Sequence, residues 1–472
     1  MWVNSPLSQH KFFASEKRVI ILVFAFCVLL RTIPELIAYP HPIGYDVINY
    51  YIPVVENFDE HWSSVASQFP LYVLFLNSVK LATHMPAHSV VTGVAIAMFG
   101  LFGTSLFYLG RSLFRLDTIR SLFCAIFPVF HMAVLRTTWD LHRDIFALTA
   151  MFFVFSLLSR SNGKKQIVAI LALAILTVGA DRMMGVLLCI SLIAHASITK
   201  RKEPIVIAVF ATGVSVILAL ASYSYYVPSS NVGGSSIEVS ADNATASYNP
   251  QDLLILFAVA NGLLVAPAVV GFFRINNSLL QVPLLASLVG SFSWLAFPSM
   301  SQLVADRWII VAGIFLAIFA SFGILHVIKN LKPRTSLFAA LSILIPFAVV
   351  GIAYAVMPYD SPFVLYGIAR QNIENFSPVT MQFNSIDIQD NPEILSTIEW
   401  INQNTEADAV IVGEKHWRGF MEIYLQDQRT YRFSENPQTL AEAIEKQGKA
   451  VYLITYDSRM QPMFAIEDIA IK

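Results

Sequence analysis

The sequence predicts an α-helical polytopic membrane protein with a small α/β domain at its C-terminus. Of its 472 residues, 56% are hydrophobic and only 13% are charged, whereas soluble proteins carry about 25% charged residues. The mean hydropathy is +0.61, and apolar runs follow one another along most of the chain. Beyond about residue 358 the composition becomes polar, with short apolar runs that suit buried strands.

About eleven runs approach the ~20 apolar residues that a membrane-spanning helix needs. Lysine and arginine gather in every second loop between these runs, for example at 111–120, 160–165 and 200–202. Cytoplasmic loops carry this excess, so we expect a multi-pass protein of the plasma membrane with a cytoplasmic N-terminus. The expected spans are residues 18–38, 88–110, 118–135, 145–159, 166–181, 183–198, 204–226, 252–273, 278–297, 307–328 and 336–357.

The chain divides into a transmembrane domain, residues 1–360, and an extracytoplasmic α/β domain, residues 361–472, which the odd number of spans places outside. The first outer loop, 39–85, contains the apolar segment 69–83, which is short and includes Lys80. We expect this segment to form a helix along the outer membrane interface rather than a further span.

Two features predict the α/β character of the C-terminal domain. Asn391-Pro392 and Asn436-Pro437 each place an N-capping residue before a proline that suits the first turn of a helix. The apolar, β-branched runs 409–413 and 450–455 are typical of buried strands.

Composition also excludes some partners. The net charge of −1 gives no support for a nucleic-acid partner. The three cysteines lie in apolar runs, without disulfide or metal-ligand spacing. We assign no metal ligand and no certain cofactor, although a divalent metal held by Asp46 and Glu56 remains an open alternative.

Ionisable residues collect at the outer ends of the expected spans. Ionisable groups inside a membrane protein normally face protein or water, so these residues are candidates for a site. Asp46 lies in the first outer loop, and Glu56 follows it. The others are Asp140, His142, Arg143 and Asp144 between the third and fourth spans, Asp181 and Arg182 between the fifth and sixth, and Asp306 and Arg307 at the start of the tenth.

The arginines suggest what this site would bind. Arg143, Arg182 and Arg307, with Arg136 nearby, stand on the side of the membrane that is usually poor in positive charge. Guanidinium groups offer a planar fork of donors that matches phosphate oxygens. Beside them, Asp46 could act as a base on an incoming hydroxyl or amide. In the alternative interpretation, the Asp-Arg pairs are interfacial ion pairs or helix caps, and Asp46 is an N-cap.

Five short motifs within residues 1–360 resemble those of a known enzyme family. They are Gly44-Tyr45-Asp46, Phe69-Pro70-Leu71-Tyr72, Gly110-Arg111-Ser112-Leu113-Phe114, Arg143-Asp144-Ile145-Phe146-Ala147 and Ala305-Asp306-Arg307-Trp308. In their order and in the layout of spans, the chain resembles the polyprenyl-phosphate-dependent glycosyltransferases of the GT-C superfamily. The nearest resemblance is to the protein O-mannosyltransferase and aminoarabinose-transferase type of archaea and bacteria.

The resemblance implies an inverting transfer of a sugar from a polyprenyl phosphate or diphosphate donor to a protein, glycan or lipid acceptor. Asp46 would be the catalytic base, and Arg143, Arg182 and Arg307 would bind the donor phosphate. The remaining polar residues of the set would support them. The lipid tail would lie in a groove between helices, and the outer domain would help to bind the acceptor.

The chain departs from the family pattern in two respects. Many relatives have paired carboxylates in the first loop, whereas Asp46 stands between Tyr45 and Val47, so Glu56 or Asp140 would have to supply the second. The Trp-Trp-Asp signature of oligosaccharyltransferases is absent. Two other hypotheses therefore stay open: a transporter or flippase for a lipid-linked or anionic substrate, and a non-catalytic GT-C-like protein.

Overall fold

The computed structural model describes residues 15–44, 46–59, 71–159, 163–224, 250–297, 305–356, 391–413, 418–433, 437–446, 450–456 and 469–471. Among them, seven helices are long and apolar enough to cross a membrane, or eight if one bent pair is counted as a single span. The protein is therefore mostly helical and suited to a membrane. Each expected span coincides with a helix except the third, 118–135, which covers two, and the count of eleven stays a prediction.

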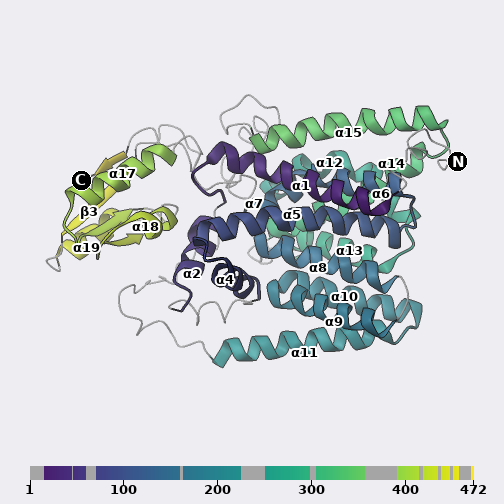
Figure 1. Cartoon of the computed structure of the whole chain (residues 1–472), viewed down its shortest axis with the longest axis horizontal. Coiled ribbons are helices and arrows are strands. Elements are labelled where there is room, and N and C mark those ends of the chain that lie inside the picture. Colours follow the sequence, from purple (N-terminus) through teal and green to yellow (C-terminus); the bar gives the residue numbers. More distant parts are fainter. Residues whose placement is uncertain are drawn as a thin grey trace.

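The helices form one bundle (Figure 1). In chain order they are α1 (Glu16–Ala38), α5 (Ala87–Ser112), α6 (Thr118–Val129), α7 (Met132–Trp139), α8 (His142–Leu158), α9 (Lys164–Ala180), α10 (Arg182–Thr199), α11 (Glu203–Ser224), α12 (Pro250–Arg274), α13 (Ser278–Phe292), α14 (Ala305–Ile328) and α15 (Pro333–Val356). Between α1 and α5 lie η2 (Val47–Tyr51), α2 (Ile52–Glu56) and α4 (Leu71–Thr83). A short 3₁₀ turn, η4 (Ser293–Leu295), follows α13.

The third expected span is broken. Helices α6 and α7 meet at an angle of 68°. Pro128 lies near the end of α6 and has no backbone N–H to donate, a common cause of helix breaks. Each residue of α7 is buried, so the short helix runs through the interior of the bundle.

The segment predicted at the interface is a helix, α4, of 13 residues. At about 1.5 Å per residue it is too short to cross a hydrocarbon core of about 30 Å. The predicted helix is therefore confirmed, whereas its position along the membrane surface stays a prediction.

Two glycines let α12 and α14 pack backbone against backbone. A Cβ atom added at Gly323 of α14 would lie 1.9 Å from the carbonyl oxygen of Pro267, and one at Gly271 of α12 would lie 2.0 Å from that of Phe319. Small residues at such crossings are characteristic of helix packing in membranes. The close approach packs the C-terminal half of α14 directly against the C-terminal half of α12.

The C-terminal unit, residues 391–471, is a four-stranded sheet with helices on both faces. The strands are β1 (Val410–Gly413), β2 (Thr430–Phe433), β3 (Val451–Tyr456) and β4 (Ile469–Ile471), in the order β2-β1-β3-β4. The first three run parallel, and β4 pairs antiparallel with β3. The helices are α17 (Asn391–Asn404), α18 (Arg418–Tyr424) and α19 (Pro437–Glu445).

The sequence predicts part of this unit. Strands β1 and β3 and helices α17 and α19 are confirmed. Alternate residues of β1 face two layers: Ile411 packs with α17 and α18, and Val412 packs with Ile444 of α19. Helix α18 and strands β2 and β4 are not foreseen, because their runs of seven, four and three residues carry little periodic signal.

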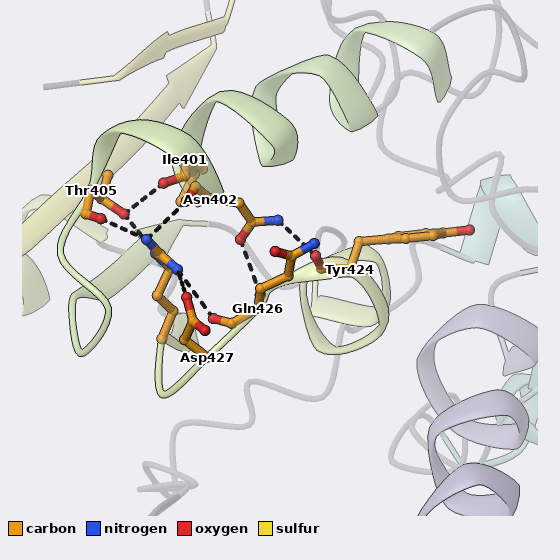
Figure 2. A network of polar contacts seen from close by, with 7 residues as sticks. Ile401, Asn402, Thr405, Tyr424, Gln426 and Asp427 are labelled. Carbon is orange, nitrogen blue, oxygen red and sulfur yellow. Dashed lines mark hydrogen bonds and ion pairs between the residues drawn. The ribbon is translucent and has the colours of Figure 1, made fainter.

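A single arginine closes the C-terminal end of α17 (Figure 2). The Nη2 atom of Arg429 donates to the carbonyl oxygens of Asn402 (3.0 Å) and Thr405 (2.6 Å), and its Nε atom donates to Thr405 Oγ1 (2.9 Å). The Nη1 atom contacts Asp427 at 2.6 Å. These bonds satisfy carbonyl groups that a helix end leaves without partners, and they fix α17 against the turn before β2.

The C-terminal unit lies at one end of the bundle, beside α2, and the start of α1 lies at the opposite end (Figure 1). Helix α18 contacts both η2 and α2. The loop that carries Asp46 is therefore on the same end of the molecule as the C-terminal unit.

The glycine crossing gives a stability prediction. Replacing Gly323 by valine should separate α12 from α14 and destabilise the protein by about 1–3 kcal/mol, the usual cost of overpacking. The measurement is the thermal unfolding midpoint in detergent. Gly262→Val, where an added Cβ meets no atom within 4 Å, is the matched control. Equal midpoints for the two variants would contradict the role of the crossing.

Candidate functional site

The Asp46 loop rests on the C-terminal end of α7. Gly44 has φ +100°, a conformation that favours glycine. A Cβ atom at this position would lie 2.0 Å from the carbonyl oxygen of Trp139. Glycine is required here both for the backbone conformation and for the contact, and together they set where Asp46 lies.

Asp140 holds the loop from the other side. The backbone N–H of Asp46 donates to Asp140 Oδ1 at 2.6 Å, and Asp140 Oδ2 pairs with Arg136 at 2.5 Å. Both Arg136 and Asp140 are buried and stand four residues apart, at the end of α7. Asp140 therefore serves as an anchor, with one oxygen on the loop and the other on its own helix.

A second buried ion pair supports α7. Arg31 and Glu35 of α1 are 2.6 Å apart, which confirms the pair that their spacing of one helical turn suggests. The Nε atom of Arg31 also donates to the carbonyl oxygen of Thr138 at 3.1 Å. The last turn of α7 is thus held by α1 as well as by the loop.

Arginines of three different helices act on the charge of Asp46. Its pKa is raised to about 6, first by burial and then by the negative charge of Asp140. The positive charges of Arg307, Arg143 and Arg136 oppose this rise. Arg143 lies in the first turn of α8 and Arg307 in the first turn of α14. Charges that are distant in sequence therefore meet at one carboxylate.

Aromatic side chains of η2 line the same region. The guanidinium of Arg143 lies 5.6 Å from the ring centre of Tyr50. The ring of Tyr51 stacks on His142, with 5.4 Å between centroids and an interplanar angle of 3°. His142 is thus placed beside the site, as the sequence predicts, but as a packing partner of Tyr51.

Two further acidic residues adjoin this cluster. Asp181 caps α10 by accepting the N–H of Met184 at 2.9 Å, so the helix-cap interpretation is correct for this residue. Asp144 and Asp181 are both buried, and their carboxyl groups lie close enough to interact. Asp144 also lies close enough to Arg143 and Arg307 to interact with their charges.

Three residues of the predicted set are not shown beside Asp46. Arg182 begins α10 with an exposed side chain, unlike Arg143 and Arg307. Glu56 is directed to Lys80, whose Nζ is 3.2 Å from its carboxylate, and it also accepts the N–H of Ala87. Glu56 therefore secures α4 and does not serve as a second carboxylate for Asp46. The side chain of Asp306 lies outside the described residues.

The described residues give no support for a metal bound by Asp46 and Glu56, because Lys80 neutralises the second carboxylate. No group of three or more His, Cys, Asp or Glu side chains in the described part of the chain could hold a metal ion.

The sequence places Arg136 near the set without assigning it a role, and it does not identify Tyr50 or Tyr51. The spacing of four residues between Arg136 and Asp140 is a signal that could have revealed their pairing. No local signal reveals the tyrosines, because their position depends on how η2 packs on α8.

No protein-family model matches this chain, and no curated protein matches it in sequence. The site's chemistry must therefore be argued from its geometry: one carboxylate with a raised pKa, held beside several guanidinium groups at one end of an apolar bundle.

The charges around Asp46 predict how it titrates. A carbodiimide modifies carboxyl groups in their protonated form, so labelling of Asp46 should fall as the pH rises through about 6. Arg307→Gln removes a positive charge that lowers this pKa, and should move the midpoint to higher pH. Peptide mass spectrometry measures the label, and Arg334→Gln, an exposed arginine of α15, is the control. A midpoint that Arg307→Gln leaves unchanged would contradict the proximity of the two charges.

Proposed function

We propose that the chain is a GT-C-type membrane glycosyltransferase that moves a sugar from a polyprenyl phosphate or diphosphate donor to an acceptor on the outer face. The observation that supports this most is that Arg143 and Arg307, from two different helices, both act on the charge of Asp46 at one end of the bundle. A carboxylate base beside phosphate-binding guanidinium groups is the arrangement that such a transfer needs.

In the proposed reaction, ionised Asp46 takes the proton from an acceptor hydroxyl or amide. The acceptor atom attacks the anomeric carbon from the face opposite the phosphate, and the bond between that carbon and the phosphate oxygen breaks. The phosphate leaves with the bonding electrons, and Arg143 and Arg307 stabilise its charge. The configuration at carbon inverts. A pKa of about 6 keeps Asp46 mostly ionised at neutral pH while it remains basic enough to accept a proton.

An apolar cavity suits the lipid part of the donor. A cavity of about 610 Å³ lies at the break between α6 and α7, where α12, α14 and α15 close it with apolar side chains. Helix α7, about 12 Å long by its eight residues, leads from this cavity to Asp140. A polyprenyl tail in the cavity could therefore be continuous with a phosphate beside Asp46.

The outer location of the site agrees with the distribution of charge. The basic loops that predict the cytoplasmic side alternate with the loops that contribute Asp46, Arg143 and Arg307. The C-terminal unit lies at the same end as the Asp46 loop and opposite the start of α1 (Figure 1). We therefore assign both to the extracytoplasmic side.

A second candidate, a transporter or flippase for a lipid-linked substrate, is favoured by the broken helix. Polar groups beside discontinuous helices near the bilayer midplane are typical of transporters. At the break, His131 Nε2 contacts the carbonyl oxygen of Ala260 at 2.9 Å. The neighbouring Asn261, halfway along α12, is buried, and its side-chain amide has no hydrogen-bond partner among the described residues. Movement of a fluorescent polyprenyl phosphate across vesicles by Asp46→Asn protein would favour this candidate.

The catalytic assignment is tested by sugar transfer from a polyprenyl phosphate donor in reconstituted vesicles. Asp46→Asn should lower kcat by about 10²-fold or more, because it removes the base. Arg307→Gln should lower the rate less and raise KM for the donor, because it removes one phosphate contact. Glu445→Gln changes an exposed carboxylate of α19 and is the control. An Asp46→Asn protein with wild-type activity would refute the assignment.

The cavity is tested by filling it. Ala266→Trp places a large side chain among the lining residues, and should raise KM for a long-chain donor several-fold while leaving a short-chain, water-soluble donor unaffected. Val269→Trp, an exposed position on the same helix that does not line the cavity, is the matched control. Equal effects on long and short donors would show that the tail lies elsewhere.

A further inference from the structure

The segment that follows Asp46 belongs to two hydrophobic cores at once. Val47 and Tyr51 of η2 are buried in the main core of the membrane bundle. Ile48, which is fully buried, belongs instead to the core of the C-terminal unit, together with Ile411 of β1 and Phe420 of α18. The segment η2 therefore packs against the membrane bundle on one side and against the C-terminal unit on the other, starting directly after Asp46.

A hydrogen bond reinforces this contact. The side-chain oxygen of Asn49 accepts the backbone N–H of Gly419, near the start of α18, at 2.8 Å. It satisfies a donor that the first turn of a helix leaves without a backbone partner. Asn49 thus supplies, from a position 370 residues away, the kind of cap that helices usually receive from their own sequence.

Gly419 makes the close approach feasible. A Cβ atom at Gly419 would lie 2.5 Å from the carbonyl oxygen of Ile48 and 2.6 Å from its Cγ2 atom. Any larger residue would push α18 away from η2. The interface therefore depends on the absence of a side chain at this position.

Different residues of η2 contact the C-terminal unit and the candidate site. Ile48 and Asn49 bind the C-terminal unit, and the next residues, Tyr50 and Tyr51, contact Arg143 and His142. A unit attached only for stability could join the bundle at any surface. Here it joins at η2, the five residues directly after Asp46, and at α2, which follows η2.

We infer that the C-terminal unit is a positioning element of the site: through Ile48 and Asn49 it holds η2, and thereby the carboxylate of Asp46, against the arginines of the bundle. The inference assigns Ile48, Asn49 and Gly419 as positioning residues. Its catalytic consequence rests on the proposed function, whereas its structural part can be tested without any activity.

The structural test is amide hydrogen exchange of the full-length protein in detergent, followed by mass spectrometry of the peptide that spans 46–56. Gly419→Val, which wedges α18 from η2, and Ile48→Ala, which removes the anchor, should each speed exchange in this peptide by about tenfold or more. Val412→Ala is the matched control, because it weakens the opposite layer of the unit, against α19. It should leave exchange at 46–56 unchanged. Unchanged exchange at 46–56 in Gly419→Val would overturn the inference.

The catalytic test compares kcat with KM. Gly419→Val and Ile48→Ala should lower kcat by about tenfold to 10²-fold through misplacement of Asp46, with little change in donor KM, because α8 and α14 carry the arginines. The acidic limb of the pH–rate profile should also move below about 6 as water reaches the carboxylate. Ile48→Val, which keeps most of the apolar side chain, should retain most of the kcat that Ile48→Ala loses. An effect on KM alone would overturn the inference.

The two proposals fail in different ways. If Asp46→Asn retains transfer, the proposed function is wrong, and the exchange measurement alone decides whether the unit holds η2. If Asp46→Asn abolishes transfer but Gly419→Val keeps the wild-type rate, pH profile and exchange, the function stands and the positioning role is wrong.

Discussion

The carboxylate of Asp140 is the interaction on which the site depends. It accepts the N–H of Asp46 through one oxygen and pairs with Arg136 through the other. Burying such a pair costs desolvation energy that its attraction only partly offsets, so it is weak as a source of stability. Its value here is geometric, because it ties a loop between helices to the end of a buried helix and adds the negative charge that helps to raise the pKa of Asp46.

The bundle supplies the surroundings that this interaction needs. The break after α6 turns α7 into the interior, so that its last turn, rather than its middle, carries Arg136 and Asp140. Arg31 binds that turn from α1, and the glycine crossing packs α14, whose first turn carries Arg307, against α12. The same break leaves the apolar cavity beside His131. One irregularity in the helices therefore accounts for both the polar site and the apolar space next to it.

The C-terminal unit extends this arrangement beyond the bundle. Its strands form one sheet, Arg429 ties α17 to the turn before β2, and α18 contacts η2. A short helix of five residues thus takes its shape from two cores. This explains why the segment after Asp46 can combine an apolar anchor, a helix cap and two aromatic contacts within five residues.

The sequence by itself determined the features that depend on local composition: the apolar segments that become helices, strands β1 and β3, and the gathering of Asp46, Asp140, Arg143 and Arg307 at helix ends. Only the tertiary structure decided which of these groups meet. It places Arg143 and Arg307 beside Asp46, leaves Arg182 exposed, and gives Glu56 to Lys80. The decisive contacts join residues 94 and 370 positions apart. Such contacts arise from how helices and strands pack together, and the periodicity of one segment does not indicate which other segment it will contact.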